Sequence, residues 1–310
     1  MATTWHGSSM LRKPDFFIVG APKCGTTALY EYLRPHPNIF MPIVKEPHFF
    51  AKDLNAYPAI QALDAYMGLF AGHTEQHLRL GEASVYYLRS SVALPNLRAF
   101  NPEARILAMF RNPVDMVYAL HGQLLYVAEE TEPDFETAWR LQDRRRQGLD
   151  LPRTCREPLL VQYREVGQFG TQAERVLANF PPSQVKLILY DDFAASPQAV
   201  YDEVLGFLGV PHDGRAEFPR INESKRARIT WLKEFMRRPP PLMHEAVMSL
   251  KQALGGEKLS ALKRRVTGLN TARERRPPLS PTFRAELVES FRPEVQRLSE
   301  IMGRDLSRWI

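Results

Sequence analysis

The chain contains 310 residues, of which 44% are hydrophobic, so it can bury a substantial core as one large α/β domain or as two smaller ones. No apolar run is long enough to span a bilayer, and residues 1–10 lack the basic start and the apolar centre of a secretory signal. Cys24 and Cys155 are too few for a disulfide framework and fit a reducing compartment. We therefore expect a soluble, cytoplasmic protein without a membrane partner.

The net charge of +6 and the isoelectric point near 9.3 favour anionic ligands. The basic residues are scattered in short clusters, and no recognisable nucleic-acid-binding module accompanies them. We therefore expect no nucleic acid among the partners, and composition leaves the oligomeric state open.

Two apolar runs in the first half of the chain are each followed by a helical pattern. Residues 14–20 (PDFFIVG) end in glycine and are typical of a buried strand, and the helix after them should end before Pro35. Residues 104–111 (ARILAMFR) form the second run, after which Asn112 and Pro113 supply an N-cap and a first-turn proline. Each run therefore predicts a strand that leads into a helix.

The second half of the chain repeats this pattern. Residues 185–192 (VKLILYDD) predict a strand, and the next helix should open at Ser196 and Pro197 and end at Gly209. Strands separated by helices favour crossover connections, a parallel sheet and a ligand site at the carboxyl ends of the strands. The fold class that we expect is α/β, with a parallel central sheet flanked by helices.

The remaining segments complete one predicted domain over residues 14–310, which follows a flexible leader of residues 1–13. Residues 237–281 contain paired prolines and glycines and predict an irregular or mobile excursion on that domain. Residues 280–303 return to helical periodicity and should pack against the sheet.

Residues 20–27 (GAPKCGTT) connect the first strand to its helix. Backbone amides at a helix start that is reached through glycine form an anion site, because they point unpaired at the ligand and the helix dipole favours negative charge. The glycine spacing is similar to that of nucleoside-triphosphate loops, but Thr26 stands where that motif has its lysine. The lysine is Lys23, inside the loop, where it would lie beside the bridging oxygen of a bound diester or anhydride.

Residues 14–33 (PDFFIVGAPKCGTTALYEYL) resemble the 5′-phosphosulfate loop of sulfotransferases that use 3′-phosphoadenosine 5′-phosphosulfate (PAPS). The resemblance is strongest to the heparan-sulfate-type (N- and 3-O-) branch and its bacterial small-molecule relatives, and it implies a P-loop-like nucleotide-binding fold. It also implies PAPS as the donor, 3′,5′-adenosine bisphosphate (PAP) as the product, and no metal. The loop residues that would contact the donor are Pro22, Lys23, Cys24, Gly25, Thr26 and Thr27.

A second segment, ILAMFRNPVDMVYALHGQ, resembles the family's 3′-phosphate motif, an arginine at a strand end followed by a helix that starts with proline. The resemblance implies that Arg111 contacts the 3′-phosphate. The chain departs from the motif at Ala119, where serine is usual, and at Met116, where arginine is common. One phosphate hydrogen bond is therefore expected to be missing or supplied from elsewhere.

A third segment, NESKRARI, resembles the late basic loop of the family, which closes over the nucleotide phosphates. Taken separately, such a basic stretch is more often an exposed, solvated loop. Together with the other motifs it is interpreted as nucleotide-binding, through Ser224, Lys225, Arg226 and Arg228.

The segment MPIVKEPHFFAKD supplies the candidate base. Pro47 disfavours helix at Glu46, so Glu46 and His48 should lie in an extended stretch. Heparan-sulfate 3-O-type enzymes carry a matching glutamate as general base, and this resemblance implies that Glu46 is the base, with His48 in support and Lys23 at the leaving oxygen. His121 is a rival base, because sulfotransferases of small phenols and steroids use a histidine; a lone helical histidine is more often a packed or surface residue.

Three further patterns have simpler interpretations. Glu82 and Ser84 resemble a family segment beside the acceptor site, but a turn that carries two tyrosines into the core explains them nearly as well. His73 and His77 would lie four apart on a helix, yet no third ligand is apparent, so we expect no metal. Cys24 lacks an identifiable partner base and is not expected to be a nucleophile.

The sequence thus predicts an enzyme of class EC 2.8.2, which transfers a sulfuryl group from PAPS to a hydroxyl or amine by in-line displacement. The acceptor is expected to be a small natural product, with a saccharide as the other possibility. A P-loop nucleotide kinase or NTPase, or a non-catalytic nucleotide-binding protein, is the alternative.

Overall fold

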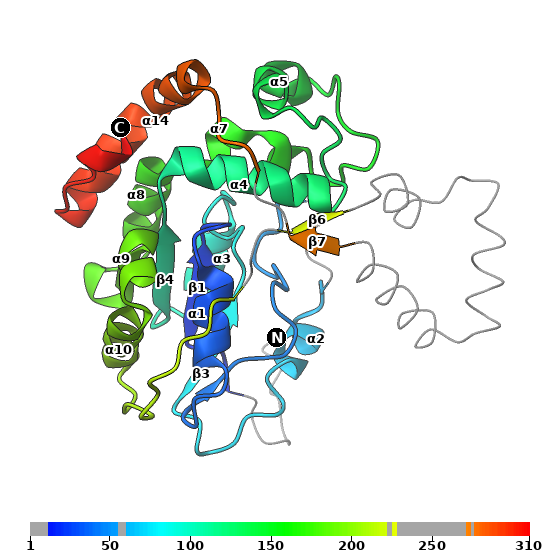
Figure 1. Ribbon diagram of the computed structural model, residues 1–310. Helices are drawn as coiled ribbons and strands as arrows, with labels where there is room; N and C mark the ends of the chain where they lie inside the picture. The colour runs from blue at the N-terminus through cyan, green and yellow to red at the C-terminus, as the bar shows by residue number, and fades with distance from the viewer. Residues whose placement is uncertain (1–11, 55–59, 222–224, 228–270, 274–275) are drawn as a thin grey trace. The chain divides into compact units, whose positions relative to one another are not determined.

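The computed structural model describes residues 12–54, 60–221, 225–227, 271–273 and 276–310 (Figure 1). The chain divides into two compact units. The first comprises Met1–Arg111, Phe169–Ile221 and Gln296–Leu306, and the second comprises Asn112–Gln168, Asn222–Val295 and Ser307–Ile310.

The first unit contains a five-stranded sheet in the order β2-β3-β1-β4-β5, and each pair of neighbouring strands is parallel. This confirms the predicted α/β class. The strands are β1 (Phe16–Gly20), β2 (Ile39–Phe40), β3 (Arg79–Ala83), β4 (Arg105–Phe110) and β5 (Val185–Leu189). The expected strands β1, β4 and β5 are present, whereas β2 and β3 were not anticipated.

The core of the first unit lies around β1, every residue of which is buried. A strand that is covered on both faces needs a continuous apolar run, and the sequence FFIVG of β1 meets that requirement. β4 follows the same rule, because its five residues after Arg105 are buried.

The first unit contains helices that connect its parallel strands and two helices that follow the last strand, β5. They are α1 (Thr26–Leu33), α2 (Leu63–Gly68), α3 (Ala93–Phe100) and α8 (Phe169–Asn179), with a 3₁₀ turn η2 (Pro182–Gln184), and, after β5, α9 (Tyr190–Ala195) and α10 (Pro197–Leu208). The path from β1 through α1 to β2 and the path from β3 through α3 to β4 run in opposite directions across the sheet. Because such crossovers are right-handed, α1 and α3 lie on opposite faces (Figure 1).

The chain leaves β1 toward one edge of the sheet and leaves β4 toward the other, although β1 and β4 are neighbours. Loops that diverge in this way open a crevice at the carboxyl ends of the two strands, which is where open α/β sheets bind ligands. The sheet order therefore directs attention to the residues directly after Gly20 and Phe110.

The caps predicted for α10 are present. The Ser196 hydroxyl accepts a hydrogen bond from the Ala199 amide, and Gly209 ends the helix with a left-handed φ of 67°. Arg79 donates to the Leu208 carbonyl at 2.6 Å, and positive charge at a helix C-terminus is stabilising.

The second unit contains α4 (Pro113–Tyr126), α5 (Phe135–Arg140), α6 (Gln142–Arg146), η1 (Pro158–Val161), α7 (Tyr163–Val166) and η4 (Ser307–Trp309). It also contains the antiparallel pair β6 (Lys225–Ala227) and β7 (Thr271–Arg273). The long helix α14 (Pro281–Met302) confirms the helix predicted over the last part of the chain. The Asn112 side chain caps α4 as expected, because it accepts from the Val114 amide at 2.9 Å.

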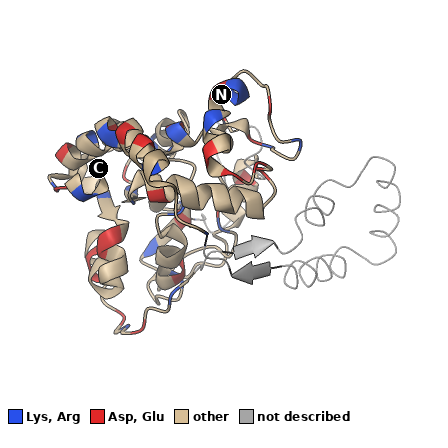
Figure 2. Ribbon diagram, turned by 45° about the horizontal axis from the view of Figure 1, so that its top comes forward, with Lys and Arg blue, Asp and Glu red and all other residues tan. Residues whose placement is uncertain are grey.

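A buried ion pair organises the interior of the second unit. Arg145 donates to the two carboxylate oxygens of Glu130 at 2.6 and 2.8 Å, and the Tyr163 hydroxyl donates to the same carboxylate at 2.7 Å. Outside this pair, Figure 2 shows acidic and basic residues interspersed on the helices. One such surface pair joins Arg284 to Asp115 at 2.9 Å.

Two expectations about local structure need comment. Residues 73–77 do not form a helix, because the chain turns there and the Thr74 amide donates to Nδ1 of His77 at 2.9 Å. Most of the excursion expected over residues 237–281 lies outside the described residues, as does most of the expected leader. None of the helices in the described ranges combines the length and the apolar character that a bilayer crossing requires.

Candidate active site

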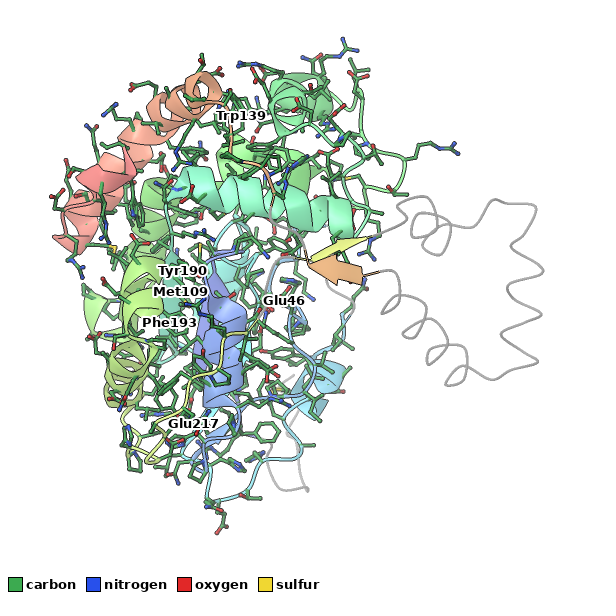
Figure 3. All side chains as sticks on the ribbon, in the orientation of Figure 1. Glu46, Met109, Trp139, Tyr190, Phe193 and Glu217 are labelled. Carbon is green, nitrogen blue, oxygen red and sulfur yellow. The ribbon has the colours of Figure 1, made fainter. Side chains whose placement is uncertain are left out.

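The loop after β1 is shaped by Gly25, which has a φ of 92°. A Cβ atom at this position would lie 3.1 Å from Cδ2 of Tyr190, 3.2 Å from Cδ1 of Phe193 and 3.3 Å from Cε of Met109. Figure 3 shows these three side chains together beside α1. Both the left-handed φ and the close packing therefore require glycine here.

The N-terminus of α1 has no side-chain cap. Thr26 begins the helix and is buried, so its hydroxyl is held within the loop, whereas Thr27 is partly exposed. The first amides of a helix have no partner inside the helix, and the helix dipole makes this end favourable for an anion. The loop thus has the backbone features expected of a phosphate site.

Two cations lie next to this helix start. Lys23 adopts a φ of 61° in the loop, and Arg111 directly follows β4. Within the described part of the chain, neither side chain forms an ion pair with a carboxylate, and the Arg111 guanidinium instead lies 4.9 Å from the ring centre of Tyr190.

The charges of these groups affect one another. Burial lowers the pKa of Lys23, the positive charge of Arg111 lowers it further, and the negative charge of Glu46 acts in the opposite direction. Lys23 is therefore close enough to interact electrostatically with both Arg111 and Glu46. Two partly buried cations that repel each other are an arrangement that a bound anion would stabilise.

Cys24 is fully buried in the same loop, and burial raises the pKa of its thiol far above the ordinary value. Burial also raises the pKa of Cys155 to about 11. Both thiols are therefore protonated at neutral pH, and the thiol is a poor nucleophile compared with the thiolate. The environment of Cys24 is that of a packing residue.

Glu46 and His48 lie in a tight segment after β2, with φ values of 61° and 51°. The Glu46 side chain is 36% exposed, and its carboxylate forms an ion pair with the neighbouring Lys45. Nε2 of His48 lies 3.6 Å from Oε2 of Glu46. Figure 3 shows Glu46 on the other side of α1 from Tyr190 and Phe193.

The environment of Glu46 keeps it ionised. Burial alone raises the pKa of this carboxyl, but the hydrogen-bonding influence of His48 and the charge of Lys45 outweigh it and lower the pKa to about 2. The sequence interpretation missed Lys45, and the signal that could have found it is its position directly beside the candidate base. Glu46 is therefore an anion across the physiological pH range.

The residues after β3 hold the Glu46 segment in place. The Glu46 amide donates to the Ala83 carbonyl at 2.9 Å, and the His48 amide donates to the Ser84 hydroxyl at 3.0 Å. The buried His48 ring stacks on Tyr86 with 5.1 Å between ring centres. The tight turn expected after Glu82 thus exists, and its polar groups support the segment that carries the candidate base.

Glu82 is fully buried in β3. Its Oε2 accepts hydrogen bonds from the hydroxyls of Tyr87 at 2.8 Å and Tyr66 at 3.1 Å. Burial raises the pKa of Glu82 to about 7, although hydrogen bonds from Ser84, Tyr87 and Tyr66 and the charge of Lys45 oppose this shift. Glu82 and the turn after it were noted from the sequence, whereas strand β3 and the partner Tyr66 were not anticipated.

His121 belongs to the second unit, on α4, and is fully buried. Its Nε2 lies 2.8 Å from the Glu132 carbonyl, and Arg276 approaches its Nδ1 at 2.8 Å. Burial lowers the pKa of His121 to about 4, and the charge of Arg276 contributes to this shift. Both ring nitrogens are thus engaged within the unit, which is typical of a structural histidine.

The predicted nucleotide-binding residues divide between the two units. Residues 22–27 and Arg111 lie in the first unit together with Glu46 and His48, whereas Lys225 and Arg226 lie in β6 of the second. Ser224 and Arg228 lie outside the described residues. The side chain of Met116, at a departure from the family motif, is buried in the second unit.

The part of the chain that the structure describes contains no group of three or more His, Cys, Asp or Glu side chains placed to hold a metal ion.

Comparison with known proteins gives a consistent result. The chain is 30% identical over 213 residues to the bifunctional heparan sulfate N-deacetylase/N-sulfotransferase 3 of Homo sapiens, which covers 66% of this chain and 23% of that protein. It is 24% identical over 257 residues to the heparan sulfate glucosamine 3-O-sulfotransferase 6 of Mus musculus, which covers 80% of this chain and 70% of that protein. It is 32% identical over 147 residues to carbohydrate sulfotransferase 15 of Rattus norvegicus and spans 26% of its length.

Among solved structures, a sulfotransferase from Alicyclobacillus acidocaldarius matches with a TM-score of 0.70 and 29% identity, over 96% of this chain and 99% of that one. The model of the sulfotransferase domain family matches residues 13–258, which is more than half of the chain. The chain therefore belongs to the sulfotransferase domain family.

Proposed function

We propose that the protein transfers the sulfuryl group of PAPS to a hydroxyl or amine, as a sulfotransferase of class EC 2.8.2. The single observation that carries this proposal is the pair of cations Lys23 and Arg111, which have no carboxylate partner in the described residues and flank the uncapped start of α1. The donor carries anionic groups at its 5′ and 3′ positions, so it can neutralise both cations. The residues present therefore fit this donor.

In this proposal the donor's 5′-phosphosulfate contacts the amides of residues 22–27 and the Lys23 ammonium, and its 3′-phosphate contacts Arg111. Lys23 stabilises the charge that develops on the bridging oxygen when the sulfur–oxygen bond breaks. Preorganised charge of this kind is usually the largest contribution to catalysis. The product that leaves the site is PAP.

The proposed role of Glu46 is to accept the proton of the attacking hydroxyl or amine. The acceptor oxygen or nitrogen forms a bond to sulfur, the bond from sulfur to the bridging oxygen breaks, and the proton moves to the Glu46 carboxylate. With a pKa of about 2, Glu46 is a weak base in the ground state. Its use is in the transition state, where attack on sulfur makes the acceptor proton strongly acidic.

The acceptor that we propose is a small alcohol or amine with an apolar body. Directly before Lys45, Ile43 is 87% exposed and Val44 is 49% exposed, so an apolar surface adjoins the segment of the candidate base. Large apolar side chains left this exposed often mark a ligand or partner surface. The names of the related heparan sulfate sulfotransferases indicate a saccharide acceptor for those proteins, and a saccharide is the other outcome of the acceptor test.

The donor proposal is tested by isothermal titration calorimetry of the purified protein with PAP, and with ATP and Mg²⁺ for comparison. We expect PAP to bind and Lys23→Ala to weaken its binding. Lys186→Ala, which removes a lysine from β5 instead of the loop after β1, is the control. Mg²⁺-dependent ATP binding that is tighter than PAP binding would contradict the proposal and favour a nucleotide kinase. Transfer of labelled sulfate to alcohols, phenols, amines and oligosaccharides then identifies the acceptor.

A further inference from the structure

The segment from Glu46 to Phe50 requires support from outside itself. Glu46 and His48 both have left-handed φ values, of 61° and 51°, although neither is glycine. Such conformations are unfavourable for residues with a Cβ and persist only where the surroundings enforce them. The hydrogen bonds that enforce them therefore contribute to the placement of the carboxylate of Glu46.

Three amides of this segment donate hydrogen bonds to Ala83, the last residue of β3, and to Ser84 and Tyr87, which follow it. The pairs are Glu46 to the Ala83 carbonyl (2.9 Å), His48 to the Ser84 hydroxyl (3.0 Å) and Phe50 to the Tyr87 hydroxyl (3.3 Å). The first uses a backbone acceptor, which no side-chain substitution removes. The third uses the Tyr87 hydroxyl, which the substitution Tyr87→Phe removes while the aromatic ring remains.

The Tyr87 hydroxyl connects this segment to Glu82. It donates to Oε2 of Glu82 at 2.8 Å and accepts from the Phe50 amide at 3.3 Å. An ionised carboxylate can only accept hydrogen bonds, so it directs the phenol proton toward itself and leaves the oxygen lone pair for Phe50. A protonated Glu82 can donate instead, and the direction of the Tyr87 bond is then no longer fixed.

We propose that Glu82 and Tyr87 are positioning residues of this sulfotransferase, which act on the reaction by fixing the segment that carries Glu46. The inference rests on the proposed function. It accounts for a fully buried carboxylate that has no ion-pair partner in the described residues and that accepts a hydrogen bond from the Tyr87 hydroxyl at 2.8 Å. Neither residue needs to touch the donor or the acceptor.

The groups that face Glu82 determine how this support depends on pH. They are Tyr66 from α2, Ser84 and Tyr87 from the turn after β3, and Lys45 from the segment of the candidate base. Burial raises the pKa of Glu82 to about 7 against these groups. Turnover should therefore fall as the pH decreases through about 7, whereas Glu46 itself, with its pKa of about 2, stays ionised.

Tyr66 provides a matched control. Its hydroxyl donates to the same oxygen of Glu82, at 3.1 Å, and its side chain is also fully buried, but in the described structure its hydroxyl forms no hydrogen bond to residues 46–50. Tyr66→Phe and Tyr87→Phe therefore remove equivalent donors from Glu82. Only Tyr87→Phe also removes the acceptor of the Phe50 amide.

The test measures kcat and KM for the three variants Tyr87→Phe, Tyr66→Phe and Glu82→Gln, together with hydrogen exchange of the peptide 41–54. We expect Tyr87→Phe to lower kcat about tenfold, with the KM for PAPS unchanged and faster exchange in the peptide, whereas Tyr66→Phe lowers kcat about threefold at most and leaves exchange unchanged. For Glu82→Gln we expect kcat to lose its fall between about pH 8 and about pH 6.

Equal effects of Tyr66→Phe and Tyr87→Phe on kcat and exchange would overturn the inference, as would an unchanged pH profile in Glu82→Gln. Thermal unfolding of each variant distinguishes a general loss of stability from a loss of positioning. The exchange measurement needs no turnover, so it decides the inference even where the wild-type protein transfers no sulfate. Absence of both transfer and PAP binding, with exchange as expected, would overturn the proposed function alone.

Discussion

Two arginines, one in each unit, differ in whether a carboxylate of the protein neutralises their charge. Arg145 is 2% exposed in the second unit, and two of its nitrogens donate to Glu130 at 2.6 and 2.8 Å. Arg111, at the end of β4 in the first unit, has no carboxylate partner in the described residues and lies against the ring of Tyr190. The first guanidinium is compensated within the protein, and the second is available to a ligand.

The carboxylates repeat this contrast. Burial raises the pKa of Glu130, but the hydrogen bonds and charge of Arg145 outweigh it, and the pKa is lowered. Burial raises the pKa of Glu82 to about 7, and within the described residues no cation forms an ion pair with it, although the charge of Lys45 opposes the shift. A compensated charge serves stability or specificity of folding, whereas uncompensated charges are concentrated where chemistry is expected.

The largest expected effect tests whether the site around Lys23 and Arg111, which have no carboxylate partner in the described residues, is catalytic. Glu46→Gln removes the proton acceptor without changing the shape of the side chain, and we expect the rate of sulfate transfer to fall about 100- to 10,000-fold. The affinity for PAP, measured by calorimetry, should not change. Glu217→Gln, at an exposed site of the first unit, is the control, and full activity of Glu46→Gln would remove Glu46 from the role of base.

The compensated region should respond in stability. Arg145→Ala leaves the Glu130 carboxylate buried and unpaired, and we expect the free energy of unfolding to fall by about 3–5 kcal/mol. Urea unfolding followed by circular dichroism measures this change. Arg144→Ala, in the same helix but solvent-exposed, should leave the free energy of unfolding nearly unchanged, and equal effects of the two variants would contradict the contrast.

The pH dependence of stability distinguishes the two carboxylates. Glu82 has a folded-state pKa of about 7 against an ordinary value of 4.5, so its contribution to stability is present below pH 4.5 and is lost as the pH rises through 7. Glu82→Gln does not titrate. The free energy of unfolding of the wild type, relative to this variant, should fall by about 3 kcal/mol between about pH 4.5 and about pH 8.

Urea titrations of both proteins at several pH values measure this difference. If the free energy of unfolding depended on pH in the same way for the wild type and Glu82→Gln, the pKa of Glu82 would not be raised in the folded state.

The smallest effect is expected from Arg111→Ala. Removal of one charged partner of a phosphate should weaken PAP binding about 10- to 100-fold in calorimetry, because a hydrogen bond to a charged group is worth about 1.5–3 kcal/mol. The free energy of unfolding should not fall, since the substitution also relieves the repulsion with Lys23. If Arg111→Ala lowered the free energy of unfolding as much as Arg145→Ala does, Arg111 would also be a structural residue, and the contrast between the two arginines would be wrong.

Local patterns were sufficient to predict much of the fold. The glycine of β1, the Asn112 cap and the Gly209 stop depend on residues that are adjacent in sequence, and all three are present. The parallel orientation of β1, β4 and β5 followed from the intervening helices, whereas their order in the sheet was not predicted. The correct prediction of these features shows that strand ends, helix N-caps and helix C-termini are specified by residues close to them in sequence.

The parts that could not be predicted depend on contacts between distant segments. β3 contains a buried glutamate and a glycine at which a Cβ would lie 2.0 Å from the Phe16 ring, so its sequence does not have an ordinary strand pattern. The pairing of Tyr66 with Glu82 joins a helix to a strand 16 residues later. The roles of Lys23, Glu46 and His48 and the extent of the single domain remain predictions.

The suppressed reactivity of Cys24 and Cys155 has a practical consequence. Because burial raises the pKa of both native thiols and so lowers their thiolate fraction, a thiol introduced at the exposed Ile43 would be the preferred target of maleimide dyes. The wild-type background can thus be used directly for single-site fluorescence labelling. Under the proposed function, a fluorophore at that position would report the binding of an acceptor near Glu46.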